Sequence, residues 1–165
     1  MIRSILTASV LGLTLAAASV PAGAQTPSAP PPAYGGPITA ADATRVALAA
    51  IEQAKKDGLA MSVAIVDPSG NLIYFQRMDD CQFGSGPVAI EKARSAALFK
   101  RPTQAFADGV AHGATYLLGL TGAVPVPGGI PLYIDGKIVG AIGSSGGTGQ
   151  QDAGISQAGA SSMHP

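Results

Sequence analysis

Residues 131–142 read Pro131-Leu132-Tyr133-Ile134-Asp135-Gly136-Lys137-Ile138-Val139-Gly140-Ala141-Ile142. The Asp135-Gly136 pair is a strong signal for a two-residue hairpin turn, because both central residues of such a turn need positive φ. Apolar runs of strand length lie on either side of it. The sequence therefore predicts an antiparallel hairpin with strands at residues 131–134 and 137–142.

A second hairpin is predicted upstream, over residues 61–78. Residues 61–66 form a short apolar run, and Asp67-Pro68-Ser69-Gly70 supplies turn residues at favourable positions. Residues 72–78 then read as the returning strand.

Helices are predicted around the two hairpins. The first covers about residues 40–57, with Thr39 as its N-cap and Gly58 as its stop. The second covers residues 88–99, with Pro87 in its first helical position.

The remaining segments are less regular. A short third helix is predicted at residues 104–110 and a terminal helix at 150–162, weakened by glycines. Residues 113–129 and 143–149 are predicted to be irregular because glycine and proline interrupt them. Two antiparallel hairpins with packed helices make an α+β domain.

The N-terminal residues read as targeting and linker sequence. Residues 1–24 combine Arg3, a short apolar run and a small-x-small pattern ending at Ala24, which predicts a signal peptide. An uncleaved anchor is the alternative, although the run is shorter than the ~20 apolar residues of a membrane span. Residues 25–37 are rich in proline and glycine and predict a flexible tether before a domain at 38–165. We therefore expect a periplasmic or secreted protein.

Charge is scarce in this chain. Lys, Arg, Asp and Glu make up 12% of its 165 residues, and without Arg3 nine basic and ten acidic residues remain. No basic patch is available to neutralise phosphates, which argues against a nucleic-acid partner. After processing, no second apolar segment could span a membrane. Few charges on a small domain predict exposed apolar surface, and hence association into homo-oligomers.

The lone cysteine, Cys81, excludes an intramolecular disulfide. A buried small side chain, a free thiol and an intermolecular bridge all remain open.

Residues 143–147 fit the G-x-S-x-G pattern of serine hydrolases. The preceding strand belongs to a hairpin, and only His164 follows the serine, so this chemistry is not supported. Glycines there would let the backbone approach another backbone or a ligand, and free N–H groups could contact an anion.

His112 is the only histidine inside the predicted domain. One histidine cannot build a structural zinc site, whereas haem needs only one or two axial ligands. Tyr116 would lie one turn away if the segment were helical, and Met78 and Cys81 are further soft ligands. An ordinary surface or core histidine is the alternative.

Charged residues gather in two places. One group, where the second predicted strand leaves the sheet, consists of Arg77, Asp79 and Asp80. The other, on the following helix, consists of Glu91, Lys92 and Arg94. Glu91 and Arg94 can pair three residues apart on the surface. The cations could instead face an acidic ligand, such as haem propionates or a small carboxylate.

An ordered series of motifs resembles the GlcG/HbpS family across residues 38–162. The series is Arg77-Met78-Asp79, Glu91-Lys92-Ala93-Arg94-Ser95-Ala96, Pro127-Gly128-Gly129-Ile130-Pro131, Asp135-Gly136-Lys137-Ile138-Val139-Gly140-Ala141-Ile142-Gly143, Ser145-Gly146 and Gln151-Asp152. The resemblance implies a profilin-like antiparallel sheet of two hairpins flanked by helices. It also implies assemblies built from dimers, and haem binding in some exported members. Ser95, Ser144 and Asp80-Cys81 depart from the residues expected of relatives.

Two functions follow as expectations. The first is an exported, non-enzymatic haem-binding protein for haem capture, storage or redox sensing. His112 and Tyr116 would lie at the iron, and the cleft would be rimmed by Arg77, Lys92 or Arg94, with Gly143, Ser145 and Gly146 as further contacts. The second is an enzyme or binding protein for a small organic acid or other metabolite. Loops 79–86 and 143–149 would frame its pocket, with Asp79, Glu91 or Asp152 as acid or base.

Overall fold

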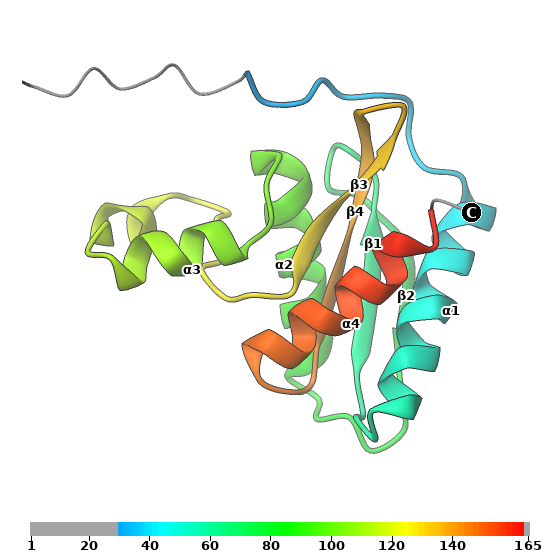
Figure 1. The fold of residues 1–165 in the computed structure, drawn as a ribbon. Coiled ribbons are helices and arrows are strands. Elements are labelled where there is room, and N and C mark those ends of the chain that lie inside the picture. Colours follow the sequence, from blue (N-terminus) through cyan, green and yellow to red (C-terminus); the bar gives the residue numbers. More distant parts are fainter. Residues whose placement is uncertain (1–29, 164–165) are drawn as a thin grey trace, which may run out of the picture. The chain divides into compact units, whose positions relative to one another are not determined.

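An antiparallel sheet forms the centre of the protein in the computed structural model, which describes residues 30–163 (Figure 1). The predicted signal peptide lies outside the described residues. Four strands make up the sheet in the described range, in the order β2-β1-β4-β3. Their bounds are Ser62–Val66 for β1, Leu72–Arg77 for β2, Gly129–Ile134 for β3 and Lys137–Ser145 for β4.

The two predicted hairpins are confirmed, and an antiparallel β1–β4 pairing joins them, with Ile65 opposite Ile142. The predicted irregular segment at 143–149 is wrong at its start, because β4 continues to Ser145. Gly143 explains the extension. A Cβ at this position would lie 2.1 Å from the Ala89 carbonyl oxygen, so the strand runs directly against the backbone of the helix above it.

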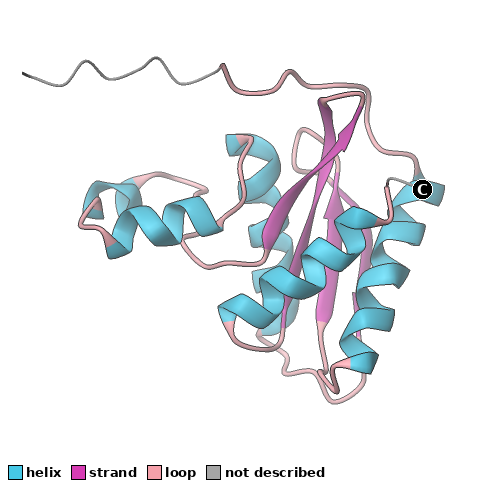
Figure 2. Cartoon of the chain, viewed as in Figure 1, coloured by secondary structure: helices cyan, strands magenta, loops and turns pink. Residues whose placement is uncertain are grey.

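Helices cover both faces of the sheet (Figure 2). On one face lie α1 (Ala40–Lys56) and α4 (Gly149–Ser161), which enclose the larger apolar core. On the other lies α2 (Ser85–Phe99), whose buried alanines allow close contact with β1 and β4. This α2 begins before the predicted start. Pro87 is still accommodated because the N–H groups of a first helical turn have no partner inside the helix. The α+β prediction is confirmed.

A charge-poor segment, residues 102–126, stands apart from the sheet, and we call it the arm. It contains α3 (Gln104–Ala111) and a 3₁₀ helix, η1 (Thr115–Gly119), where the sequence predicted irregular structure. Figure 1 shows α3 projecting to one side of the β-sheet layer. Phe106 is buried in α3, and η1 buries none of its residues. The arm therefore presents most of its side chains to the surroundings.

The outer edge of β3 meets the base of the arm. The Thr103 N–H donates to the Gly129 carbonyl at 3.0 Å, and the Gly129 N–H donates to Thr103 Oγ1 at 2.9 Å. Two residues on, Pro131 has no N–H group to offer. Gly129 and Pro131 therefore have no free N–H group to offer to a further strand at this edge.

Part of the predicted tether is held against the domain. Tyr34 forms a parallel bridge with Ile138, and the Gly35 and Ile38 N–H groups donate to the carbonyls of Ile138 and Val139. The Tyr34 hydroxyl also donates to the Ala97 carbonyl at 3.0 Å. Residues 33–37 therefore extend the ordered domain, because strand β1 ends early and leaves β4 backbone groups free to pair.

No helix between residues 30 and 163 is both long enough and apolar enough to cross a membrane.

Asp67, in the turn between β1 and β2, is a titratable side chain held by several hydrogen bonds. Burial alone would raise the pKa of Asp67, but hydrogen bonds from the Asn71 side chain and from the Asn71 and Ser69 N–H groups outweigh it and lower this pKa. A lowered pKa contributes stability above the ordinary value of about 3.9, and that stability is lost as the pH falls through the folded-state value. We expect Asp67→Asn to destabilise the protein at pH 7, with the difference from wild type shrinking below about pH 4. Urea unfolding across pH measures this; a difference independent of pH would contradict it.

Candidate functional site

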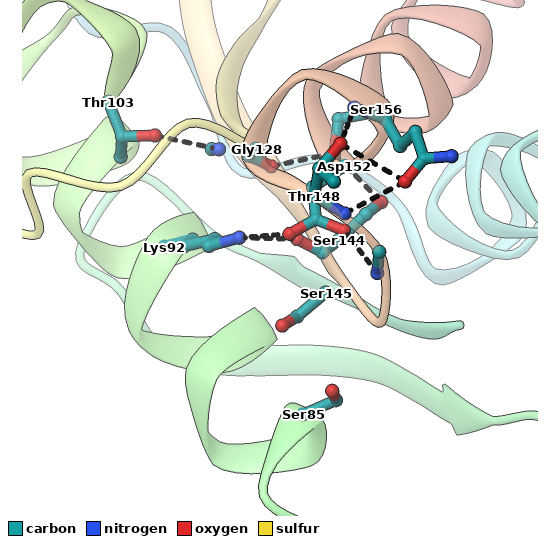
Figure 3. A network of polar contacts seen from close by, with 12 residues as sticks. Ser85, Lys92, Thr103, Gly128, Ser144, Ser145, Thr148, Asp152 and Ser156 are labelled. Atoms are coloured by element: carbon teal, nitrogen blue, oxygen red, sulfur yellow. Dashed lines mark hydrogen bonds and ion pairs between the residues drawn. The ribbon is translucent and has the colours of Figure 1, made fainter. Parts of the chain in front are cut away.

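A buried ion pair joins the two faces of the sheet. Lys92, on α2, places Nζ 2.6 Å from Asp152 Oδ2 at the start of α4, and their side chains are 1% and 4% exposed (Figure 3). Lys92 Nζ also donates to the Ser144 carbonyl at 3.1 Å. Asp152 Oδ1 accepts the Gly147 N–H at 2.9 Å. The glycine-rich exit of β4 thus does bind an anion, and the anion is the protein's own carboxylate.

Two serines and a glycine complete what we call the Lys92 cluster: Lys92, Asp152, Ser144, Ser156 and Gly128. Ser156 Oγ lies 2.7 Å from the Gly128 carbonyl and 2.8 Å from Ser144 Oγ. Gly128 has φ +123°, and a Cβ there would lie 3.0 Å from Lys92 Nζ. Only glycine lets the 127–129 loop close over the ion pair.

The structure thus places Lys92 and Asp152 in the interior and paired with each other, and not at the rim of an open cleft. The sequence holds a signal for this burial. Lys92 shares the helix face of Ala89 and Ala96, and Asp152 shares that of Ile155 and Gly159. Two opposite charges, each on a buried helix face, are expected to pair with each other.

A groove runs beside the cluster, between β3 and α4. It consists of two adjoining clefts of about 280 and 370 Å³ that share Pro102, Ile130 and Gln157. Gly128, which covers the ion pair, also lines it. Among the described residues, none that lines the groove carries a charged side chain, and we call it the neutral groove. Its apolar walls and amide groups suit an uncharged surface better than a carboxylate.

The other predicted cations are not gathered at this groove. Arg94 pairs with Glu91 at 2.6 Å, which confirms the predicted surface pair and occupies Glu91. Arg77 ends β2, at the opposite edge of the sheet from β3, donates to the Cys81 carbonyl at 2.6 Å and lies over the Phe83 ring. The structure thus separates Arg77, Lys92 and Arg94 instead of placing them around one ligand.

Gly143, Ser145 and Gly146 lie at the end of β4 and just beyond it. Ser145 is nearly buried, and its carbonyl lies 3.9 Å from Cys81 Sγ. A Cβ on Gly146 would lie 2.3 Å from the Ala60 carbonyl oxygen. Because they have no side chain, Gly143 and Gly146 let this segment lie directly against the backbone at Ala89 and Ala60. The contact with Cys81 places loops 79–86 and 143–149 beside each other.

His112 caps the C-terminal end of α3 and is exposed. Its Nδ1 lies 2.7 Å from the Asp108 carbonyl oxygen, which can only accept a hydrogen bond. Nδ1 is therefore the donor, and the neutral ring carries its lone pair on Nε2. Carbonyl contacts of this kind orient metal-binding histidines.

Tyr116 is not one α-helical turn from His112, because α3 ends at Ala111 and Gly113 turns the chain with φ +90°. Tyr116 lies in η1 on the same arm and is 78% exposed. The two residues thus share an exposed segment without sharing a helix.

Cys81 is buried, the first of the three alternatives that its sequence left open, with Sγ 3.4 Å from Ser62 Oγ. Met78 Sδ accepts the Met61 N–H at 3.4 Å. Among residues 30–163, no group of three or more His, Cys, Asp or Glu side chains is placed to hold a metal ion.

Asp79 lines an open cleft of about 340 Å³ with Lys55, Arg77 and Met78. Asp79 therefore lies beside an accessible hollow with two neighbouring cations.

Known proteins resemble this chain in both sequence and fold. A family model described as "haem degrading protein HbpS-like" matches residues 38–161. Protein GlcG of Escherichia coli K12 is 38% identical over 103 residues, which cover 62% of this chain and 77% of GlcG. A double mutant of Streptomyces reticuli HbpS superposes with a TM-score of 0.74 at 32% identity, covering 90% of this chain and 99% of that one. The crystal structure of a PduOC–heme complex gives 0.69 at 29% identity, covering 78% and 96%. The chain belongs to the HbpS-like family.

Proposed function

We propose that this protein binds haem, with His112 as an axial ligand through Nε2. The observation that carries the proposal is the exposed His112 side chain, whose Nδ1 lies 2.7 Å from the Asp108 carbonyl oxygen and so leaves the lone pair of the neutral ring on Nε2. The relative solved with heme and the family description support the same ligand class.

The residues around His112 have the apolar character that a porphyrin ring needs. A porphyrin is a large apolar disc, and most of its binding surface is the macrocycle itself. Tyr116 and Leu118 offer exposed apolar surface on the arm, which bears one charged side chain, that of Asp108. Bound haem would supply redox and oxygen chemistry at its iron. The chain's own residues would orient the ring and exclude water from it. Haem capture, storage or redox sensing fits this arrangement without a catalytic group.

Two properties of the whole protein belong to the same proposal. Residues 1–24 support export, which would place the protein in the periplasm or outside the cell. The low charge content and the exposed arm support a homo-oligomer.

The test is a titration of purified protein with haemin, followed by the Soret band. We expect saturable binding, and we expect His112→Ala to shift or broaden the band because the iron loses its nitrogen ligand. His164→Ala, which removes the other histidine of the chain, is the matched control and should leave the band unchanged. Absence of a saturable Soret change in the wild type would overturn the proposal. An unchanged band in His112→Ala would remove His112 from it.

A small acidic ligand is the second candidate, favoured by the cleft that holds Lys55 and Arg77 beside Asp79. Native mass spectrometry of protein purified without haem should then show a bound organic acid that Arg77→Gln releases. A mass equal to that of the bare chain would count against this candidate.

A further inference from the structure

Tyr34 holds the last turn of α2. Its hydroxyl oxygen lies 3.0 Å from the Ala97 carbonyl oxygen and 3.2 Å from the Leu98 carbonyl oxygen. Carbonyl oxygens only accept, so the hydroxyl is the donor and its one proton is shared between them. The last carbonyls of a helix have no partner inside the helix, so this contact satisfies groups that would otherwise face water. Tyr34 is itself fixed to β4 by its bridge to Ile138. Residues 33–37, which we call the strap, therefore fasten the end of α2 to the sheet.

Lys100, directly after α2, is held by the same side chain. Its φ of +56° lies in the left-handed region, which is costly for a residue with a Cβ. The Lys100 ammonium nitrogen lies 4.1 Å from the centre of the Tyr34 ring, within the range of a cation–π interaction. A residue other than glycine keeps such a backbone conformation only where its surroundings hold it. The path of the chain out of α2 thus depends on both the ring and the hydroxyl of Tyr34.

This path leads directly into the arm. Phe99, the last residue of α2, packs edge to face on Phe106, with ring centroids 5.3 Å apart. Phe106 is the buried residue of α3, and His112 caps the C-terminal end of the same helix. The far end of the arm also returns to α2, where the Val124 N–H donates to Ser95 Oγ at 3.0 Å. The direction of α3, and with it the position of His112, is therefore set by the C-terminal part of α2.

We propose that Tyr34 is a positioning residue for the haem site, because the strap sets the direction in which the arm presents His112. This rests on the proposed function for its ligand. A side chain that binds a metal must lie within about 0.5 Å of its productive position. Tyr34 acts through the last turn of α2. When this turn frays, Phe106 loses the ring on which it packs, α3 moves, and Nε2 of His112 leaves the iron.

The test is a haemin titration of the full chain carrying Tyr34→Ala. Tyr34 is 42% exposed, so the fold should tolerate the change. We expect the haemin affinity to fall about tenfold, as for the loss of one hydrogen bond and one cation–π contact. We also expect the Soret band to move toward that of His112→Ala, because His112 is displaced from the iron. Tyr34→Phe keeps the ring beneath Lys100 and loses only the hydroxyl, so its affinity and band should fall between those of wild type and Tyr34→Ala.

Tyr74→Ala is the matched control. Tyr74 packs against the larger apolar core, on the face of the sheet opposite α2. Its loss should lower the melting temperature and leave the haemin affinity and the Soret band unchanged. Wild-type affinity and band in Tyr34→Ala would refute the role of Tyr34. An equal band shift in Tyr74→Ala would refute it too, because general loss of stability would then explain both variants.

Amide hydrogen exchange of the haem-free protein separates the role of the strap from the proposed function. Tyr34→Ala should speed exchange in α3 about tenfold, while α1 keeps its wild-type rates. If the wild type binds no haemin, the haem proposal fails, and faster exchange in α3 still upholds the hold of the strap on the arm. If haemin binds through His112 and Tyr34→Ala changes neither the exchange nor the band, the role of the strap fails and the haem proposal stands.

Discussion

Replacing Lys92 by Met should lower the free energy of unfolding by about 3–5 kcal/mol, because it leaves a buried carboxylate without its partner. Met keeps most of the apolar stem of the side chain and removes the ammonium that bonds Asp152 at 2.6 Å and the Ser144 carbonyl at 3.1 Å. Asp152 would keep one partner, the Gly147 N–H. Equilibrium unfolding in urea at pH 7 measures the change.

The double variant Lys92→Met with Asp152→Asn is the control for this prediction. It carries no buried charge, and the amide oxygen can still accept the Gly147 N–H. Its loss should be clearly smaller than that of Lys92→Met alone, because breaking a buried pair costs more than replacing both charges. A double variant as unstable as the single one would show that side-chain shape, not charge, holds this position.

Replacing Gly143 by Ala should cost at least about 3 kcal/mol, at the upper end of overpacking effects. A Cβ there would lie 2.1 Å from the Ala89 carbonyl oxygen and 2.6 Å from the Ala93 nitrogen. Both are backbone atoms of α2, so no side-chain rotation relieves the clash. The helix must move off β4, which exposes the alanine core between them. Thermal and urea unfolding give the size of the loss.

Gly154→Ala is the matched glycine variant. No atom lies within 4 Å of its Cβ position, and the residue sits inside α4. Alanine there should stabilise the protein by about 0.5–1 kcal/mol, the ordinary helix preference over glycine. If Gly143→Ala were as mild as Gly154→Ala, the close approach of α2 to β4 would be wrong.

The local elements were predictable because each depends on neighbouring residues. Asp135-Gly136 and Asp67-Pro68-Ser69-Gly70 fix their turns within a few residues, and Thr39 caps α1 through the Asp42 N–H, as its position predicts. The extension of β4 to Ser145 was not predictable in this way. Its glycines look like loop residues until α2 is placed against them, and that contact joins residues far apart in the sequence.

In the candidate site, too, contacts between residues close in sequence were predictable and those between distant residues were not. The Glu91–Arg94 pair follows from helical spacing alone. The Lys92–Asp152 pair joins residues 60 positions apart, and so depends on how α2 and α4 are placed around β4. The helix faces of the two residues indicate burial, but only the packing of α2 and α4 brings the two charges together. The 3₁₀ turn in the arm arises after Gly113, where the sequence alone suggested only a loop.

The Thr103–Gly129 contact and Pro131 also bear on aggregation. An open edge strand is a template on which further chains can add strand after strand, and such growth has no natural end. Here the N–H and carbonyl of Gly129 are both hydrogen-bonded to Thr103, and Pro131 has no N–H for an added strand. Growth of a continuous sheet from β3 is therefore blocked at successive outward positions. A chain so poor in charge has little electrostatic repulsion to keep its copies apart, and this blocked edge removes one route by which they could add strands to one another.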